Sequence, residues 1–243
     1  TIANVSRMAD MDDPTRMLFT SSTYSASLKM VSDVGFWDSD VIPEDWHMFL
    51  KCFFKLGGKV TCEPIRVPVF YDAPQSTGFI KTLINRYIQN RRQAWGVTDI
   101  PYALRESFSH PEIPLVKKFN RLFSLVRTHL IWSSHWSILT LGATIPPLIN
   151  PVFAQTVAGH NLPTLSRIIL TTCLLALVGI IIIDIKMRPK KPAHLPKWLG
   201  ITNLLQWVFL PVTTLLLSSL PGLDAHTRLM LGKRLEYQVT EKV

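Results

Sequence analysis

The chain has 243 residues, of which 47% are hydrophobic and 18% charged, with a formal net charge of +9 at pH 7. This length allows one medium soluble domain together with a few membrane spans. The three cysteines are odd in number and have no short paired spacing, which argues against a disulfide framework and against a zinc site.

The positive charge is concentrated in two runs, residues 81–127 and 186–197. Nucleic-acid binding is one interpretation of such a balance. Both runs adjoin uncharged stretches of membrane length, however, and basic residues beside membrane segments mark the cytoplasmic side. We therefore expect a lipid bilayer, and not a nucleic acid, as the partner of these runs.

Near the start of the chain, residues 10–13 contain an Asp-x-Asp pattern that could in principle hold a divalent cation. The segment follows no apolar strand and ends at Pro14, as a solvated turn does. No metal ligand is assigned to it.

Two helices are predicted next. Hydroxyl side chains at residues 21–25 open a short helix that ends at Gly35. A second helix is predicted over residues 44–56, because Pro43 suits a first helical turn and the helix dipole favours acidic side chains there. On its own, the pair Glu44-Asp45 indicates a plain helix start.

Short strands are predicted at residues 59–62 and 65–71, where Pro64 and Pro68 restrict them to edge positions. A long helix follows over residues 79–95, since apolar residues recur there on one helical stripe. Gln89 and Arg92 stand three apart on one face of this helix. A guanidinium can hold a diphosphate bidentately, and a solvated basic face is the alternative role for Arg92.

Residues 115–131 alternate bulky apolar and basic side chains at helical spacing, which is typical of a helix lying in the membrane interface. A helix packed on the soluble domain is the alternative. Three uncharged runs of membrane length follow, one starting near Trp132, one at residues 168–183 and one at residues 198–223. His129, beside the first run, is expected at the aqueous interface rather than on a metal.

The acidic pair, the later segment Gln89-Asn90-Arg91-Arg92-Gln93-Ala94-Trp95-Gly96 and the membrane-length runs together resemble the membrane-bound family-two glycosyltransferases. That group includes cellulose, chitin and hyaluronan synthases. Its members have an acidic pair ending in Asp, which supplies the catalytic base, and then a Gln-x-x-Arg-Trp motif. Gln89 and Arg92 match the first and fourth motif positions, but Gln93 stands where the family has Trp.

The resemblance implies an α/β nucleotide-sugar glycosyltransferase domain, of which only the C-terminal half is present, followed by an interfacial helix and about three transmembrane helices. The implied boundaries are residues 1–112 for the cytosolic domain, 113–131 for the interface helix, 132–223 for the membrane region and 224–243 for a tail. We expect a multi-pass membrane protein with its catalytic part cytosolic. As a fragment, it is expected to be inactive alone.

The implied reaction is transfer of a sugar from a nucleotide-diphosphate donor to a glycan or lipid-linked acceptor, with inversion. Asp45 would be the general base, and Glu44 would orient the helix start. Gln89 and Arg92 would contact the donor diphosphate or the acceptor, and Trp95 would stack on a sugar or pack in the core. The family implies a divalent cation, Mg²⁺ or Mn²⁺, whose ligands are not expected in this chain.

A second function class stays open at this point. The missing motif Trp and the missing donor-binding half are also compatible with a non-catalytic polytopic membrane protein that carries a cytosolic adaptor domain. The side of the membrane on which the C-terminus lies is likewise open, because a third full crossing would place the last basic residues outside.

Overall fold

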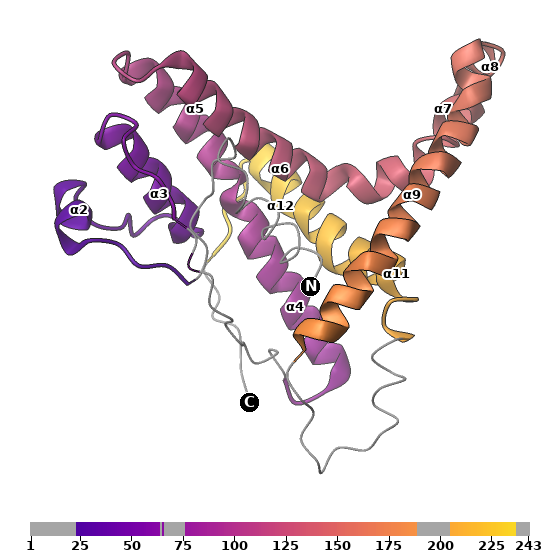
Figure 1. Cartoon of the computed structure of the whole chain (residues 1–243), viewed down its shortest axis with the longest axis horizontal. Helices are drawn as coiled ribbons and strands as arrows, with labels where there is room; N and C mark the ends of the chain where they lie inside the picture. The colour runs from indigo at the N-terminus through magenta and orange to yellow at the C-terminus, as the bar shows by residue number, and fades with distance from the viewer. Residues whose placement is uncertain (1–22, 64, 66–75, 189–204, 237–243) are drawn as a thin grey trace. The chain divides into compact units, whose positions relative to one another are not determined.

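The structure is a computed structural model that describes residues 23–63, 65, 76–188 and 205–236 (Figure 1). It divides into two compact units. Unit 1 comprises Thr1–Ala9 and Ser134–Leu215, and unit 2 comprises Asp10–Ser133 and Leu216–Val243.

Unit 2 contains α2 (Leu28–Asp33), α3 (Glu44–Lys55), α4 (Phe79–Ala94), the 3₁₀ turn η1 (Trp95–Thr98), α5 (Asp99–Ser109), the first two-thirds of α6 (Leu115–Leu141) and α12 (Leu220–Met230). Unit 1 contains the end of α6 with α7 (Ile145–Ile149), α8 (Pro151–Ala154), α9 (Val157–Met187) and α11 (Leu210–Thr214). The π-helical turn η2 (Leu215–Ser219) continues α11 into α12.

Helix α3 is the centre of unit 2, because every residue from His47 to Phe54 is buried. Met48 and Cys52 pack against Val31 and Val34 at α2. The remaining apolar side chains of α3 form the largest core cluster with three residues from α5, the α5–α6 loop and α6, namely Ala103, Ile113 and Leu125. The buried part of α3 is therefore held between α2 on one side and α5 with α6 on the other.

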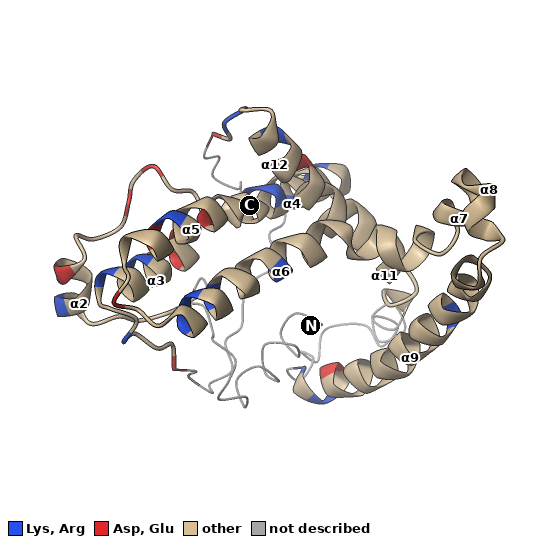
Figure 2. Ribbon diagram, turned by 90° about the horizontal axis from the view of Figure 1, so that it is seen from above, with Lys and Arg blue, Asp and Glu red and all other residues tan. Residues whose placement is uncertain are grey.

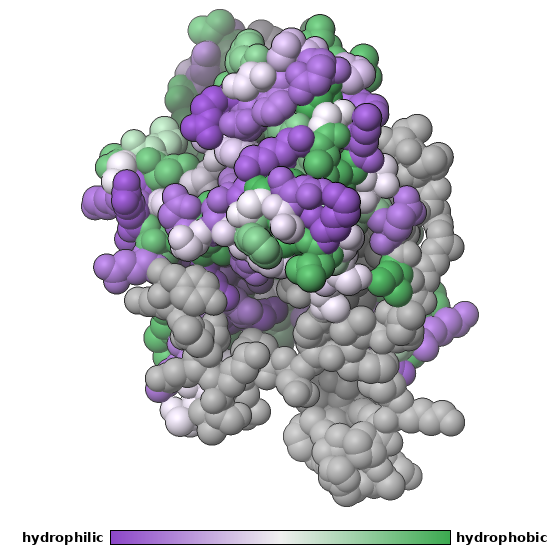
Figure 3. All heavy atoms as spheres, turned by 90° about the vertical axis from the view of Figure 1, so that its left-hand side faces the viewer, coloured by the Kyte–Doolittle hydropathy of each residue, from purple (hydrophilic) through white to green (hydrophobic). Residues whose placement is uncertain are grey.

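A second centre forms where α12 packs on α4 and η1. Ala94 and Trp95 contact Ala225, with Trp132 of α6 beside them. Asn90 donates its side-chain amide to the backbone carbonyl of Leu217. Ala225 of α12 thus belongs to a core cluster that is separate from those around the acidic helix α3. On the face of unit 2 shown in Figure 3, hydrophilic side chains predominate and smaller apolar areas lie among them.

Helix α3 ends in a Schellman motif. The N–H of Gly58 donates to Phe53 O at 2.8 Å, and the N–H of Gly57 donates to Phe54 O at 3.1 Å. Both glycines have positive φ, +65° and +71°. Gly58 also packs closely against Ile113 of the core, which leaves no room for a side chain at this turn.

The predicted fold class, an α/β domain followed by about three transmembrane helices, is wrong. Within the described residues every regular element is a helix. The strand predicted at residues 59–62 is an irregular segment whose Val60 and Cys62 pack onto the helical core. A short apolar alternation does not by itself make a strand, because a strand needs a neighbouring strand to pair with. In the described part of the chain this segment lies beside helices instead.

The number of membrane spans is also corrected. Of the helices in the described ranges, only α9 is long and apolar enough to cross a membrane, with a mean hydropathy of 2.8 over its most apolar window. Figure 2 shows most of α9 without charge and charged side chains near its C-terminal end. The first predicted span instead breaks after Leu141 into two short helices, and part of the third packs on α4.

Several predictions fall on residues that the structure does not describe. These are the Asp-x-Asp turn at residues 10–13, most of the strand predicted at 65–71, most of the basic run 186–197 and the beginning of the third span. The helices predicted at residues 79–95 and 115–131 are confirmed by α4 with η1 and by α6.

Adjacent glycines at the end of α3 give a matched test of the turn. A Cβ at Gly58 would lie 3.0 Å from Ile113 Cγ2, whereas a Cβ at Gly57 would have nothing within 4 Å. Gly57→Ala should cost about 1 kcal/mol because of its left-handed backbone alone. Gly58→Ala should cost about 1 kcal/mol more, because it also overpacks the core. Equal unfolding midpoints in thermal denaturation would contradict this close approach.

Candidate functional site

The acidic pair lies in the first turn of α3, as the sequence predicts. Oδ1 of Asp45 accepts a hydrogen bond from the backbone N–H of Trp46 at 2.9 Å. The positive end of the helix dipole favours a carboxylate at this position. Because every residue from His47 to Phe54 is buried, the pair sits at the edge of a rigid core rather than in a loose loop.

The fold brings the surroundings of the acidic pair against the later motif segment. Ile42 packs onto the cluster that contains Trp95. Pro43 Cγ lies 3.5 Å from the place a Cβ would occupy on Gly96. The residues that immediately precede Glu44 therefore contact those that closely follow Arg92, although about fifty positions separate the two segments in the sequence.

Around Arg92 the two neighbouring polar residues have structural partners. Arg91 forms an ion pair with Asp224 of α12 at 2.9 Å. Asp224 also pairs with Arg228 at 2.6 Å. Gln89 accepts a hydrogen bond from Arg86 at 3.0 Å. Arg92 is half-buried in the last turn of α4, so its backbone is fixed by the same α4–α12 packing.

Trp95 is 8% exposed and belongs to the core cluster with Ala94 and Ala225. Of the two roles open for this residue, its burial supports packing. Gln93, which stands at the family's Trp position, is exposed.

Sequence reasoning missed a buried polar network behind the acidic pair. His47 Nδ1 lies 2.6 Å from Asp99 Oδ1, and His47 Nε2 lies 3.2 Å from Asp38 Oδ2. Lys51, one turn further along α3, donates to the other oxygen of Asp38 at 2.6 Å. Two basic side chains four residues apart inside an otherwise apolar helix are the signal that could have revealed this network.

The charge state of His47 follows from these contacts. Burial by itself lowers the pKa of the His47 imidazole, but the hydrogen bonds and charges of Asp99 and Asp38 outweigh it and raise the pKa above its ordinary value. Through Asp99 and Asp38, His47 ties α3, two residues after Asp45, to α5 and to the loop that precedes the helix.

His129 is not at an aqueous interface as predicted, because only 2% of its surface is exposed. Its ring lies edge-on to Trp46 with centroids 6.0 Å apart and stacks on Trp132 at 6.1 Å. Burial, with the charge of His226 adding to it, lowers the pKa of His129 to about 4. A neutral imidazole from α6 thus supports the residue that follows Asp45.

No three His, Cys, Asp or Glu side chains in the described ranges come together as a set that could hold a metal ion. Asp10 and Asp12 lie outside those ranges. The described residues therefore do not fit the divalent cation that the family implies.

The sequence profile described as "Glycosyl transferase family group 2" matches residues 8–220. This match covers most of the chain, including the acidic pair, α4 and α9. No curated protein and no solved structure matches the chain.

The network around His47 makes a prediction about pH. Since the pKa of His47 is raised by folding, its contribution to stability is complete below its unfolded pKa of about 6.5 and is lost as pH rises through the folded value. His47→Gln should cost about 1.5–3 kcal/mol near pH 5.5. The difference in thermal midpoint from wild type should shrink as pH rises above about 6.5.

The exposed His160 offers a control, and His160→Gln should leave the midpoint close to that of wild type. A difference between wild type and His47→Gln that grows with pH would show that His47 is neutral in the folded protein.

Proposed function

The chain belongs to glycosyl transferase family group 2, matched over residues 8–220, and on that premise we propose that Asp45 is the general base of an inverting sugar transfer. As a glycosyltransferase, the protein moves a sugar from an activated donor to an acceptor. The proposal adds that the donor is a nucleotide-diphosphate sugar and that the acceptor is a glycan or a lipid-linked sugar.

One observation carries the proposal: Glu44 and Asp45 occupy the first turn of a helix whose next residues, from His47 to Phe54, are all buried. A sugar hydroxyl is too weakly acidic to attack unaided at neutral pH, so a carboxylate must accept its proton as the new bond forms. Asp45 takes that proton while the acceptor oxygen attacks the anomeric carbon. Attack from the side opposite the leaving group inverts the configuration, and Glu44 supports the helix start.

The leaving diphosphate gains negative charge as its bond to the sugar breaks, and positive groups positioned for that charge lower the barrier. We assign this role to Arg92, with Gln89 as a polar contact one turn earlier on α4. The Arg91–Asp224 ion pair supports the assignment, because it anchors the last turn of α4 to α12. Trp95 acts from the core: its cluster packs against Ile42 and so fixes the segment that leads into the acidic pair.

The proposed location at a membrane rests on α6, which presents three faces. One face packs on unit 2 through Lys118, Arg121, Leu125 and His129. A second face is apolar yet exposed, and it consists of Leu115, Val116, Phe119, Phe123, Val126 and Leu130. A third, narrower face carries exposed polar residues, Asn120 and Arg127 among them. An exposed apolar stripe of this length beside a polar stripe suits the bilayer interface.

The packed face corrects one detail of the sequence interpretation. Lys118 and Arg121 do not point to water. Lys118 donates to two carbonyls at the C-terminal end of α5, Ser107 O at 2.7 Å and His110 O at 3.1 Å. Arg121 lies over the ring of Phe49 at 4.4 Å, and burial lowers its pKa to about 10. The helix can therefore pack on the domain with one face and lie at the membrane with another.

Helix α9 completes the proposed membrane anchor. It has 31 residues, and at about 1.5 Å per residue it exceeds the hydrocarbon thickness of a bilayer. Its side chains are largely exposed, which suits contact with lipid. By the positive-inside rule, the basic run at residues 186–197 would then lie on the cytosolic side of this helix.

The base assignment is tested in the whole enzyme by substitution. Asp45→Asn should lower the rate of sugar transfer by about 10²–10⁴-fold, because the general base is lost, while membrane insertion and donor binding stay close to wild type. Glu44→Gln should have a milder effect. Asp40→Asn, in the exposed turn before the helix, is the control and should leave the rate unchanged.

Two results would contradict the assignment in different ways. If Glu44→Gln abolishes transfer while Asp45→Asn does not, the base is the other carboxylate. If both variants keep full activity, the acidic pair is not the base at all.

The interface proposal for α6 is tested by single cysteines in a background without Cys52, Cys62 and Cys173. Cysteines at Phe119 and Phe123 should react with a lipid-soluble maleimide in proteoliposomes, because both positions lie on the exposed apolar face. Cysteines at Asn120 and Arg127 should react with a charged, water-soluble maleimide. Equal reaction of all four positions with the water-soluble reagent would exclude the interface location.

A further inference from the structure

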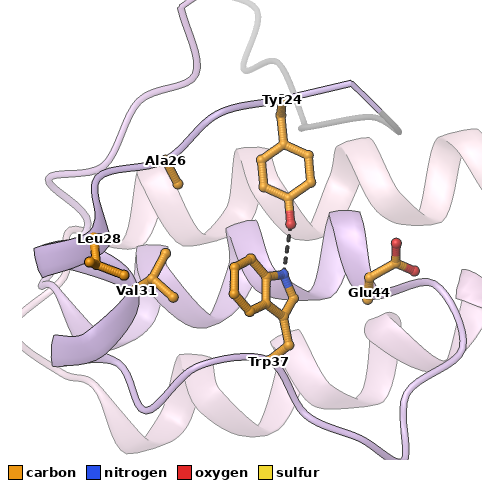
Figure 4. Close-up of a pocket in the computed structure, with 6 residues that line it drawn as sticks. All are labelled: Tyr24, Ala26, Leu28, Val31, Trp37 and Glu44. Atoms are coloured by element: carbon orange, nitrogen blue, oxygen red, sulfur yellow. Dashed lines mark hydrogen bonds between the residues drawn. The ribbon is translucent and has the colours of Figure 1, made fainter.

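An open groove of about 490 Å³ lies beside the acidic pair (Figure 4). Its lining combines an indole, a phenol and a carboxylate with small aliphatic surface, and consists of Tyr24, Ala26, Leu28, Val31, Trp37 and Glu44. The volume falls within the range of about 300–1,000 Å³ typical of small-molecule sites. Because Glu44 lines the groove, the groove reaches the first turn of α3.

Trp37 is the principal surface of this groove. Trp37 is 47% exposed, and its indole Nε1–H donates to the hydroxyl of Tyr24 at 2.7 Å. The polar edge of the indole is thus satisfied within the protein, and its apolar faces are what the groove offers. A pyranose ring has an apolar face of C–H groups that packs on such a ring, with hydroxyls at its rim.

The turn that carries Trp37 is held from both sides. Gly35 and Phe36 have φ of +84° and +61°, a conformation that a bulky residue such as Phe36 adopts only when its surroundings enforce it. The enforcing group is the buried Lys51, which donates to Phe36 O at 2.8 Å and to Asp38 Oδ1 at 2.6 Å. These contacts fall on the two neighbours of Trp37, so the exposed indole is preorganised.

The groove also lies within electrostatic reach of the proposed base. Burial raises the pKa of the Tyr24 phenol, the hydrogen bond from Trp37 partly offsets this, and the charges of Glu44 and Asp45 raise it further. Both carboxylates are therefore close enough to Tyr24 to act on its hydroxyl. A ring seated on Trp37 would lie in the same groove as Glu44.

We propose that this groove binds a neutral pyranose ring of the acceptor, with the apolar face of the sugar on Trp37 and its hydroxyls on Tyr24 and Glu44. The inference rests on the proposed function, since it supplies the acceptor for Asp45. Two neighbouring carboxylates repel the anionic diphosphate of a donor, which argues for the neutral substrate. A purely lipidic ligand would leave the carboxylate of Glu44 without a polar partner.

The test is direct binding of sugars to the chain. Neutral tetrasaccharides of glucose, N-acetylglucosamine, mannose and galactose are titrated into protein labelled with 5-fluorotryptophan, and the fluorine resonances are followed. At least one saccharide should bind saturably and shift the resonance of Trp37, which Trp37→Phe identifies. Trp37→Ala should weaken the affinity by about tenfold, and Trp37→Phe by less. Phe108→Ala, at a more exposed aromatic residue outside the groove, should bind as wild type.

The proposal is overturned if no saccharide binds at about 10 mM, a concentration that detects even millimolar affinity, or if a saccharide binds without moving the Trp37 resonance. The fluorine shift is measured on the unaltered groove, so it shows whether a saccharide binds at Trp37 even if Trp37→Ala fails to fold. Asp45→Asn separates this proposal from the preceding one. A fully active Asp45→Asn enzyme refutes the base assignment, whereas saccharide binding at Trp37 upholds the groove independently.

Discussion

The burial of α3 is the constraint on which the rest of unit 2 depends. Eight consecutive residues, from His47 to Phe54, are enclosed, so helices must cover every side of it. Two of the eight, His47 and Lys51, are basic, and a buried basic group needs a partner of opposite charge or a hydrogen-bond acceptor. The partners come from Asp38 before the helix and Asp99 on α5. Enclosing one helix therefore orders both the loop before the acidic pair and the helix behind it.

The same packing relates the candidate site to the membrane. α6 covers α3 with a face that contains Arg121 over two phenylalanine rings, and this orientation turns its apolar residues outward. His129 on the packed face contacts Trp46, the neighbour of Asp45. A helix proposed to lie in the bilayer interface is thus in direct contact with the acidic helix. The proposed base and the proposed membrane surface are coupled through one set of side chains.

The success of sequence reasoning depended on the length of each periodic pattern. Residues 79–95 and 115–131 have apolar positions repeated over several turns, and both are helical. The alternation at residues 59–62 is too short to distinguish a strand from an extended segment laid on a helical core. Apolar composition also overcounted membrane spans, because it does not reveal whether residues 216–223 face lipid or, as here, pack beside α4.

The sequence by itself determined local features: an acidic pair at a helix start, and Gln89 and Arg92 one turn apart on a helix. Such features depend on capping, dipole and periodicity, which act over a few residues. Only the tertiary structure decided that His47 meets Asp99, 52 residues away, that Arg91 meets Asp224, 133 residues away, and that Trp95 is enclosed. These contacts follow from which helix faces pack together, and a local pattern shows that a face is apolar or charged without naming the segment that covers it.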